Sequence, residues 1–295
     1  MMMTYQNITL IGGGTLGSQI AYMAAYHGKE VTIWGRSEAS LDRAKKRVAR
    51  WQAAVQDYFH SSDAKAEEAK AHLTYTTNLK EALQGADLVI EALPENPQVK
   101  QDFYRQFAQL ADPKTVIATN SSTMMPTKLA DATGRPDKFL AYHFANTIWQ
   151  GNTAEIMPGQ KTAKDLPATF VELSKEIGMV PIMVNKEQPG YVLNSLLVPF
   201  LDAGTDLWVR GVADPQTIDK TWMIATASPQ GPFGIMDTVG MKTVYEINRA
   251  NPDEAHQAAA KKIKHMIDEG KLGVETGQGF YSYPNPAYRQ ADFLK

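Results

Sequence analysis

Short apolar runs alternate with helical patterns along the first 184 residues of the chain. Strand-like runs occur at residues 8–11, 30–34, 72–76, 87–92, 115–119 and 180–184. After the first run, Leu16, Ile20 and Met23 recur at the spacing of one helix face, and Gly28 follows as a helix-ending residue. Strands that alternate with helices in this way predict an α/β fold built on a parallel sheet.

A longer helical pattern occupies residues 40–71, where a plain crossover between strands needs only one helix. Its apolar stripe comprises Leu41, Ala44, Val48, Trp51 and Val55. Ser62 then offers a cap before a charged helix at residues 64–71. We therefore expect a helical hairpin inserted into the first domain. Such a hairpin either covers a ligand or presents a solvated face.

The strand pattern largely stops after residues 188–190, and helical patterns follow. They span residues 191–210, 214–225, 242–251 and 254–269. The change predicts an α/β domain at residues 1–188 and an all-helical domain at residues 189–295. The first of these helices is apolar enough to favour a partner surface and hence a homodimer, although a self-contained core explains it equally well.

Composition excludes several classes of protein. The chain has 295 residues, 43% of them hydrophobic and 21% charged, as in ordinary globular proteins. The net charge of −2 gives no sign of nucleic-acid binding, and no apolar run approaches the ~20 residues of a membrane span. Because the chain lacks cysteine and a signal-like start, we expect a cytoplasmic protein without disulfides or thiolate metal sites.

A glycine-rich turn connects the first apolar run to the first helix. Gly12, Gly14 and Gly17 form a G-x-G-x-x-G pattern that also contains Thr15 and Leu16. Between a strand and a helix, this pattern predicts dinucleotide binding in a doubly wound, Rossmann-type domain. The glycines allow a tight turn, close approach of a pyrophosphate and close helix packing, and the helix N-terminus receives the phosphates.

The residues after the second strand are unusual for NAD binding. An acidic residue normally stands there to bind the ribose 2′-hydroxyl, whereas this chain has Gly35, Arg36 and Ser37. A guanidinium and a hydroxyl suit a 2′-phosphate, so these residues favour NADP. The alternative is that Arg36 stacks on the adenine ring while NAD still binds.

Polar side chains follow the later strands of the predicted sheet. Glu95 lies in the loop after residues 87–92, and Lys100 lies in the first turn of the next helix. Asn120 and Ser122 follow residues 115–119. Because α/β folds bind ligands at the carboxyl ends of their strands, these residues are candidates for the cofactor and substrate site. Any one of them could instead cap a helix.

His143 and Glu155 are the candidates for proton transfer. His143 ends an apolar run that begins at residue 139, and Glu155 begins another. An imidazole exchanges protons near neutral pH, and a carboxylate on its second nitrogen would fix its tautomer. The alternative is a satisfied histidine and an unrelated glutamate. Asn194, in the first turn of the long apolar helix, either binds a backbone carbonyl or points at a substrate.

Several motifs in order resemble those of the 3-hydroxyacyl-CoA dehydrogenase family. They are Gly12-x-Gly14-x-x-Gly17, residues 89–92 with Glu95, Asn120-Ser121-Ser122, His143-Phe144 with Asn146, and residues 189–194, 231–233 and 276–281. The step from His143 to Glu155 matches as well, and the likeness covers nearly the whole chain.

The resemblance implies a Rossmann-type domain, a helical dimerisation domain and an active site between them. His143 looks like the catalytic base and Glu155 like its partner. Ser122 and Asn194 look like hydrogen-bonding groups at the substrate oxygens. The residues implied to contact the nicotinamide or the substrate are Glu95, Lys100 and Asn146. The implied reaction is the NAD(P)-dependent interconversion of 3-hydroxyacyl and 3-oxoacyl compounds, as in fatty acid metabolism.

Two departures from the family pattern bear on specificity. Gly35 replaces the usual Asp, and Thr147 follows Asn146 where proline is common. The loop at residues 147–152, which we expect beside the substrate, looks more like the diketoreductase branch, which reduces β,δ-diketo esters without coenzyme A. Two alternatives therefore remain. One is a reductase of 3-oxo or diketo esters, and the other is a non-catalytic dinucleotide-binding or crystallin-like protein.

Overall fold

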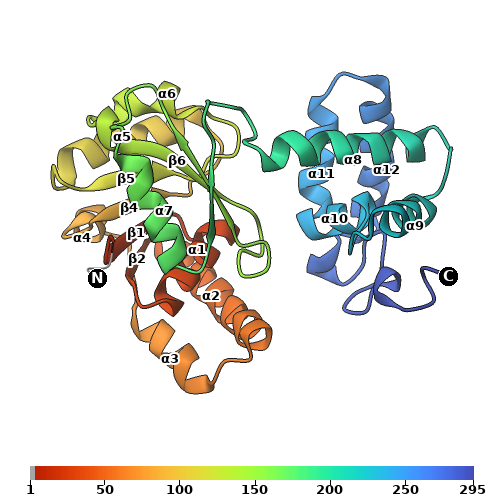
Figure 1. Cartoon of the computed structure of the whole chain (residues 1–295), viewed down its shortest axis with the longest axis horizontal. Helices are drawn as coiled ribbons and strands as arrows, with labels where there is room; N and C mark the ends of the chain where they lie inside the picture. The colour runs from red at the N-terminus through yellow and green to blue at the C-terminus, as the bar shows by residue number, and fades with distance from the viewer. Residues whose placement is uncertain (1–3) are drawn as a thin grey trace. The chain divides into compact units, whose positions relative to one another are not determined.

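Residues 4–295 are described by a computed structural model, in which they form two compact units (Figure 1). The first unit extends to Val192, and the second comprises Leu193–Lys295. Each unit buries apolar side chains of its own. Within the described range, no helix combines the length and the apolar character needed to cross a bilayer.

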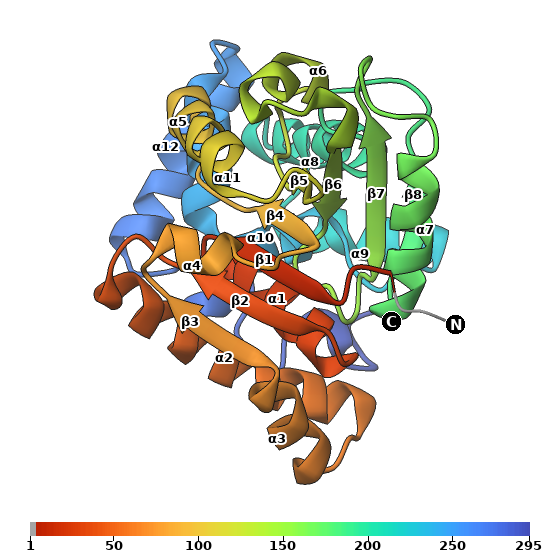
Figure 2. The ribbon, with the colours of Figure 1, turned by 90° about the vertical axis from the view of Figure 1, so that its left-hand side faces the viewer.

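The first unit is built on one eight-stranded sheet with the order β3-β2-β1-β4-β5-β6-β7-β8. The strands are β1 (Asn7–Ile11), β2 (Glu30–Trp34), β3 (Leu73–Thr76), β4 (Leu88–Glu91), β5 (Val116–Thr119), β6 (Phe139–Phe144), β7 (Thr153–Pro158) and β8 (Val180–Met183). Figure 2 shows them side by side, from β3 at one edge to β8 at the other. The first six are parallel, whereas β7 pairs antiparallel with β6 and parallel with β8. This topology confirms the predicted doubly wound α/β fold.

Helices cover both faces of this sheet. One apolar core forms beneath α1 (Thr15–Tyr26), α2 (Glu38–Phe59), α3 (Asp63–Ala71) and α7 (Leu166–Glu176). The other forms beneath α4 (Leu79–Leu83), α5 (Pro97–Leu110) and α6 (Pro126–Leu129). Because both faces are covered, the central strands β4 and β5 are buried at every position and mostly apolar, as is typical of parallel strands of this kind.

The inserted hairpin is present as α2 and α3. Its predicted stripe faces the core, with Leu41, Ala44, Val48 and Val55 buried. The hydroxyl of Ser62 caps α3 by accepting a hydrogen bond from the Lys65 amide at 3.3 Å. The hairpin therefore belongs to the first unit through its apolar stripe.

The second unit contains the four predicted helices, each within two residues of its predicted bounds, and one further helix, α10. They are α8 (Leu193–Val209), α9 (Pro215–Thr226), α10 (Pro232–Val239), α11 (Met241–Ala250) and α12 (Glu254–Asp268). The long helix begins two residues later than predicted, because Gly190 and Tyr191 have left-handed φ angles of 79° and 56°. The sequence patterns predict neither α10 nor, in the first unit, α7. Both have a proline in the first turn, which suits a helix start although proline breaks helix interiors.

Two buried aspartates organise the glycine-containing motifs of the second unit. Asp219 accepts hydrogen bonds from the amides of Phe233 and Gly234, both at 2.9 Å. Asp237 accepts from the amides of Phe280 and Tyr281 at 2.8 and 2.9 Å. A Cβ atom at Gly279 would lie 2.0 Å from a carboxylate oxygen of Asp237. The motifs at residues 231–233 and 276–281 therefore hold this unit together.

Short 3₁₀ segments complete the secondary structure. They lie at Ala130–Thr133, Pro136–Lys138, Val274–Thr276 and Ala287–Arg289.

Candidate active site

The glycine-rich turn between β1 and α1 has the geometry of a phosphate-binding loop. Gly12 has a φ of 104°, and a Cβ atom there would lie 2.8 Å from the carbonyl oxygen of Ala92. A Cβ atom at Gly17 would lie 2.1 Å from the Gly12 oxygen, whereas one at Gly14 would meet nothing within 4 Å. The turn thus needs glycine for its conformation at Gly12 and for close packing at Gly17, and it is open at Gly14.

Helix α1 begins directly after this open position. Gly14 is the N-cap and makes no side-chain cap to the first turn, which begins with Thr15 and Leu16. Unpaired first-turn amides and the positive end of the helix dipole attract a phosphate. The turn and the helix start together fit the pyrophosphate of a dinucleotide.

A cavity of about 680 Å³ opens beside the glycine-rich turn. It is lined by Gly12, Gly13, Gly14, Trp34, Gly35, Arg36, Ser40, Arg43, Arg47, Leu79, Ala92, Leu93, Pro94, Val99, Asp102, Phe103 and Gln106. Three guanidinium groups and one carboxylate line this space, so it favours a polyanion. Apolar side chains such as Val99 and Phe103 offer a surface for a flat ring.

Two of the three arginines are not identified by the sequence analysis. Arg43 and Arg47 stand four residues apart on α2, so they share one helix face, and a guanidinium nitrogen of Arg47 donates to the Gly13 oxygen at 3.3 Å. Two arginines four residues apart on the helix that follows the second strand are the sequence signal that could have located them. Among the predicted residues, Arg36 is exposed and lines the cavity.

Ser37 serves as the N-cap of α2. Its hydroxyl accepts a hydrogen bond from the Ser40 amide at 3.3 Å, and the Ser40 hydroxyl donates to the Ser37 carbonyl oxygen at 2.6 Å. Ser40, rather than Ser37, is among the residues that line the cavity. Gly35 is buried, and a Cβ atom there would lie 2.6 Å from the Ser40 hydroxyl oxygen and 2.7 Å from Leu41.

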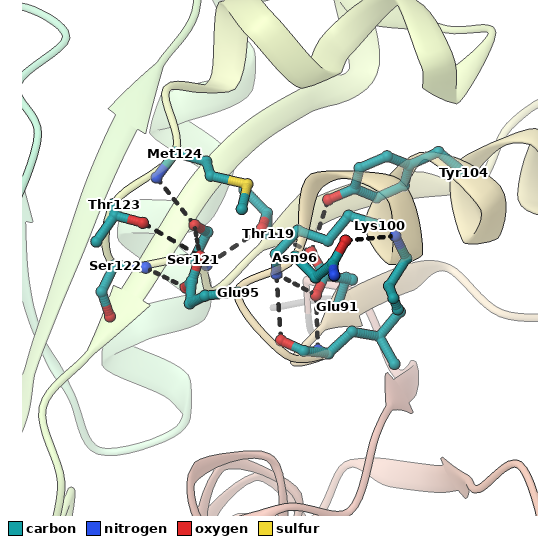
Figure 3. A network of polar contacts seen from close by, with 12 residues as sticks. Glu91, Glu95, Asn96, Lys100, Tyr104, Thr119, Ser121, Ser122, Thr123 and Met124 are labelled. Carbon is teal, nitrogen blue, oxygen red and sulfur yellow. Dashed lines mark hydrogen bonds and ion pairs between the residues drawn. The ribbon is translucent and has the colours of Figure 1, made fainter. Parts of the chain in front are cut away.

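A buried carboxylate at the end of β4 gathers several donors (Figure 3). One oxygen of Glu91 accepts from the Lys100 ammonium and from the Leu93 amide, both at 2.6 Å. The other accepts from the Tyr104 hydroxyl at 2.6 Å and from the Thr119 hydroxyl at 2.8 Å. Burial, reinforced by Glu91, raises the pKa of Tyr104 well above its usual value, so this hydroxyl remains a donor.

Lys100, which the family resemblance implies to contact the nicotinamide or the substrate, is buried in the first unit. Its side chain is 1% exposed, and its ammonium binds Glu91 and, at 3.3 Å, the carbonyl oxygen of Leu93. The ion pair therefore joins α5 to the loop that follows β4. This loop carries Glu95, so Lys100 fixes the path of the chain toward Glu95.

Glu95 reaches from that loop to the residues after β5 (Figure 3). Its carboxylate accepts from the Ser122 amide at 2.8 Å and from the hydroxyls of Ser121 and Thr123 at 2.7 and 3.3 Å. Asn120, next to them, accepts from the Phe144 amide at 3.1 Å through its side-chain oxygen. Glu95 and Asn120 thus tie the ends of β4, β5 and β6 together.

His143 and Glu155 meet across the antiparallel pair of β6 and β7. They are direct partners in the strand register, and His143 Nδ1 lies 2.9 Å from Glu155 Oε2. His143 Nε2 lies 3.1 Å from the Ser122 hydroxyl. Since a carboxylate only accepts, Nδ1 carries a proton and Nε2 faces Ser122 with its lone pair. Serine, imidazole and carboxylate form one hydrogen-bonded line, with His143 only 3% exposed.

The loop between β6 and β7 packs into the first unit. Thr147 has a φ of 61° and donates its amide to Gln19 Oε1 at 2.7 Å, and proline permits neither feature. Ile148 and Trp149 are buried, and the Trp149 ring centroid lies 5.7 Å from that of Trp51. Asn146 is exposed at the start of the loop. Ile148 and Trp149 therefore serve the core, and the exposed part of the expected substrate loop begins at Asn146.

Asn194 belongs to the second unit, in the first turn of α8. It follows Val192 by two residues, and the Val192 amide donates to Glu155 Oε1 at 2.9 Å. Of the four predicted catalytic residues, the first unit brings Ser122, His143 and Glu155 into direct contact. The role of Asn194 stays a prediction.

Nearly the whole chain is similar to proteins of one known family. Residues 7–188 match the family model for the NAD binding domain of 3-hydroxyacyl-CoA dehydrogenase, and residues 190–283 match that for its C-terminal domain. The 3-hydroxybutyryl-CoA dehydrogenase of Clostridioides difficile is 31% identical over 283 residues, which cover 94% of this chain and 99% of that protein.

Two solved structures are similar to this chain over nearly its whole length. A diketoreductase structure, described as a case of substrate-directed dual catalysis of dicarbonyl compounds, is 48% identical with a TM-score of 0.89. The aligned region covers 96% of this chain and 100% of the diketoreductase chain. The (S)-3-hydroxybutyryl-CoA dehydrogenase of Ralstonia eutropha is 29% identical with a TM-score of 0.78, covering 95% of this chain and 100% of its own.

Replacing Lys100 with Met should destabilise the first unit by about 3–5 kcal/mol, because it leaves Glu91 as a buried charge without its cation. Urea unfolding followed by tryptophan fluorescence measures the change. Adding Glu91→Gln to Lys100→Met should recover part of the loss, because it removes the charge. Lys175→Met, which breaks an exposed pair with Glu172, is the control and should cost less than about 1 kcal/mol. Equal losses for the two lysine variants would contradict the prediction.

Proposed function

This chain belongs to the 3-hydroxyacyl-CoA dehydrogenase family, an oxidoreductase family that interconverts 3-hydroxyacyl and 3-oxoacyl compounds, and we propose that His143 performs its proton transfer. The observation that carries the proposal is the line from Ser122 through His143 to Glu155, with distances of 3.1 and 2.9 Å. A non-catalytic dinucleotide-binding or structural protein needs no such line.

The hydrogen bonds of His143 determine which of its nitrogen atoms exchanges a proton with the substrate. In oxidation, His143 Nε2 accepts the proton of a 3-hydroxyl group, and in reduction it returns that proton to the 3-oxo group. Glu155 holds Nδ1–H and stabilises the imidazolium that forms. Ser122 donates a hydrogen bond to the substrate oxygen from its place beside Nε2. A nicotinamide dinucleotide held at the glycine-rich turn of Gly12, Gly14 and Gly17 would supply the hydride in reduction and take it up in oxidation.

Asn194 is the second proposed donor to the substrate oxygens. Its family resemblance and its position two residues after Val192, which binds Glu155, support this role. Glu95 and Asn146 are proposed to lie on the nicotinamide or substrate side of the site. Glu95 also fixes the Ser122 amide, so it shapes the substrate site even where it does not touch the substrate.

Replacing His143 with Ala should lower the rate of acetoacetyl-CoA reduction by a hundred- to ten-thousand-fold, on the order expected for loss of a general acid. Dinucleotide affinity, measured by quenching of protein fluorescence, should stay nearly unchanged. His265→Ala is the control, because that side chain is 76% exposed on α12, and it should leave the rate unaltered. Unchanged activity of the His143 variant would rule out the proposed mechanism.

We propose two candidate substrate classes, which differ in whether coenzyme A carries the acyl group. Acyl-CoA substrates are the first, supported by the family models and by the 3-hydroxybutyryl-CoA dehydrogenases among the relatives. Diketo esters are the second, supported by the 48% identity with a diketoreductase over 96% of the chain. Initial rates with acetoacetyl-CoA and with a β,δ-diketo ester, each at equal concentration, distinguish the two. The faster substrate identifies the class, and turnover of neither would contradict both.

For the cofactor, we propose a preference for NADP over NAD. Support comes from Arg36 and Arg43 in the cavity and from Gly35, where Ser40 and Leu41 fill the space that an acidic side chain would need. A 2′-phosphate brings additional negative charge to a space already lined by cations. A 2′-hydroxyl, in contrast, meets no carboxylate at this position to accept its hydrogen bond.

Replacing Arg36 with Ala should raise the KM for NADPH roughly tenfold or more, because a charged hydrogen bond contributes about 1.5–3 kcal/mol. The KM for NADH should change much less, since NADH lacks the 2′-phosphate. Arg50→Ala, on the same helix as Arg43 but outside the cavity lining, is the matched control. Equal effects on the two dinucleotides would show instead that Arg36 stacks on the adenine.

We also propose a homodimer formed through the second unit. Several large apolar side chains on α8 and α9 are exposed in the described chain, including Leu196 at 70%, Ile224 at 55% and Trp222 at 39%. A second copy of the same chain can cover this face isologously. Leu196→Asp should convert the dimer to monomer in sedimentation equilibrium without loss of dinucleotide binding. A monomeric wild-type chain at micromolar concentration would refute the proposal.

A further inference from the structure

A tyrosine covers one face of the catalytic imidazole. The ring of Tyr191 stacks on that of His143, with centroids 4.4 Å apart and planes inclined by 13°. Tyr191 is 1% exposed and packs with Ala141, Met157 and Val184. The proposed proton transfer does not use this side chain.

The hydroxyl of Tyr191 is tied to the serine loop. It donates a hydrogen bond of 2.6 Å to the carbonyl oxygen of Ser121, the residue before Ser122. Burial, with a further contribution from Glu155, raises the pKa of Tyr191 far above its usual value, so the phenol stays protonated and continues to donate. One side chain thus contacts both the imidazole and the loop that carries Ser122.

The backbone at Tyr191 adopts an unfavourable conformation to make these contacts. Its φ of 56° lies in the left-handed region, which costs a bulky residue energy unless its surroundings hold it there. Gly190, also left-handed, donates its amide to the Ser122 carbonyl oxygen at 3.2 Å, and Val192 donates its amide to Glu155 at 2.9 Å. Three consecutive residues therefore contact Ser122, His143 and Glu155 in turn.

We propose that Tyr191 is the positioning residue of His143, restraining the imidazole through its ring and the serine loop through its hydroxyl. This inference rests on the proposed function of His143. Glu155 and Ser122 fix the two nitrogen atoms at the edges of the imidazole but leave it free to tilt about the line between them. A ring stacked on one face opposes that tilt, and the same π face stabilises the imidazolium formed in turnover.

The test compares Tyr191→Phe, which keeps the ring, with Tyr191→Met, which removes the ring but fills much of its volume. Tyr142→Phe is the control, because it removes another buried hydroxyl, bonded to Ser174 at 2.8 Å, from the residue next to His143. For each variant we would measure kcat and KM with the substrate that the wild-type enzyme reduces, the Kd of the dinucleotide, and unfolding by urea.

We expect Tyr191→Met to lower kcat roughly tenfold to a hundredfold, the size of effect that a misplaced catalytic group produces. KM and the dinucleotide Kd should stay within about twofold of the wild-type values. Tyr191→Phe, which keeps the ring and loses only the hydrogen bond to Ser121, should lower kcat by a smaller factor than Tyr191→Met. A kcat for Tyr191→Met equal to that of the control would overturn the proposal, as would equal losses of kcat for the Phe and Met variants.

Two further comparisons keep the test decisive. If Tyr191→Met does not fold, as judged by dinucleotide binding, Tyr191→Leu takes its place under the same expectations. His143→Ala, assayed in parallel, separates this inference from the proposed function. If His143→Ala abolishes turnover while the ringless Tyr191 variant does not lower kcat, only the positioning role fails. If His143→Ala is fully active, the proposed function fails with it.

Discussion

The antiparallel pairing of β7 with β6 is the constraint on which the candidate site depends. With parallel neighbours alone, His143 at the end of β6 would be surrounded only by residues that follow other strands at the same edge of the sheet. The reversed strand returns along β6 in a register that sets Glu155 directly opposite His143. The backbone ladder therefore aligns imidazole and carboxylate at 2.9 Å, and no flexible loop has to position them.

The parallel part of the sheet contributes the third member of the line and its support. Ser122 follows β5, and its amide is held by Glu95 from the loop after β4. That loop is in turn fixed by the buried pair of Glu91 and Lys100. Charged hydrogen bonds thus fix the loop after β4 and, through Glu95, the backbone of Ser122, whose hydroxyl lies beside His143 Nε2. Preorganised polar groups of this kind do not have to be reordered during the reaction.

Sequence patterns predict the strands and the glycine turn because these features depend on the local period of apolar residues, and the order of family motifs implies the pairing of His143 with Glu155. Other features depend on tertiary contacts. Lys100 turns inward because Glu91, nine residues earlier, ends a buried strand. Arg43 reaches the cavity through the rotation of α2, which its buried stripe decides. The left-handed backbone of Tyr191 leaves no mark in a sequence where an apolar helix pattern continues through it.

The crowding at Gly35 bears on how cofactor choice can change over evolutionary time. An acidic residue introduced there would meet the Ser40 hydroxyl, which is engaged in capping α2, and Leu41, which is buried in the core. A single substitution at Gly35 would therefore disturb the start of α2. A side chain at position 35 therefore calls for compensating changes at Ser40 or Leu41, so the residue at this position is coupled to the start of α2.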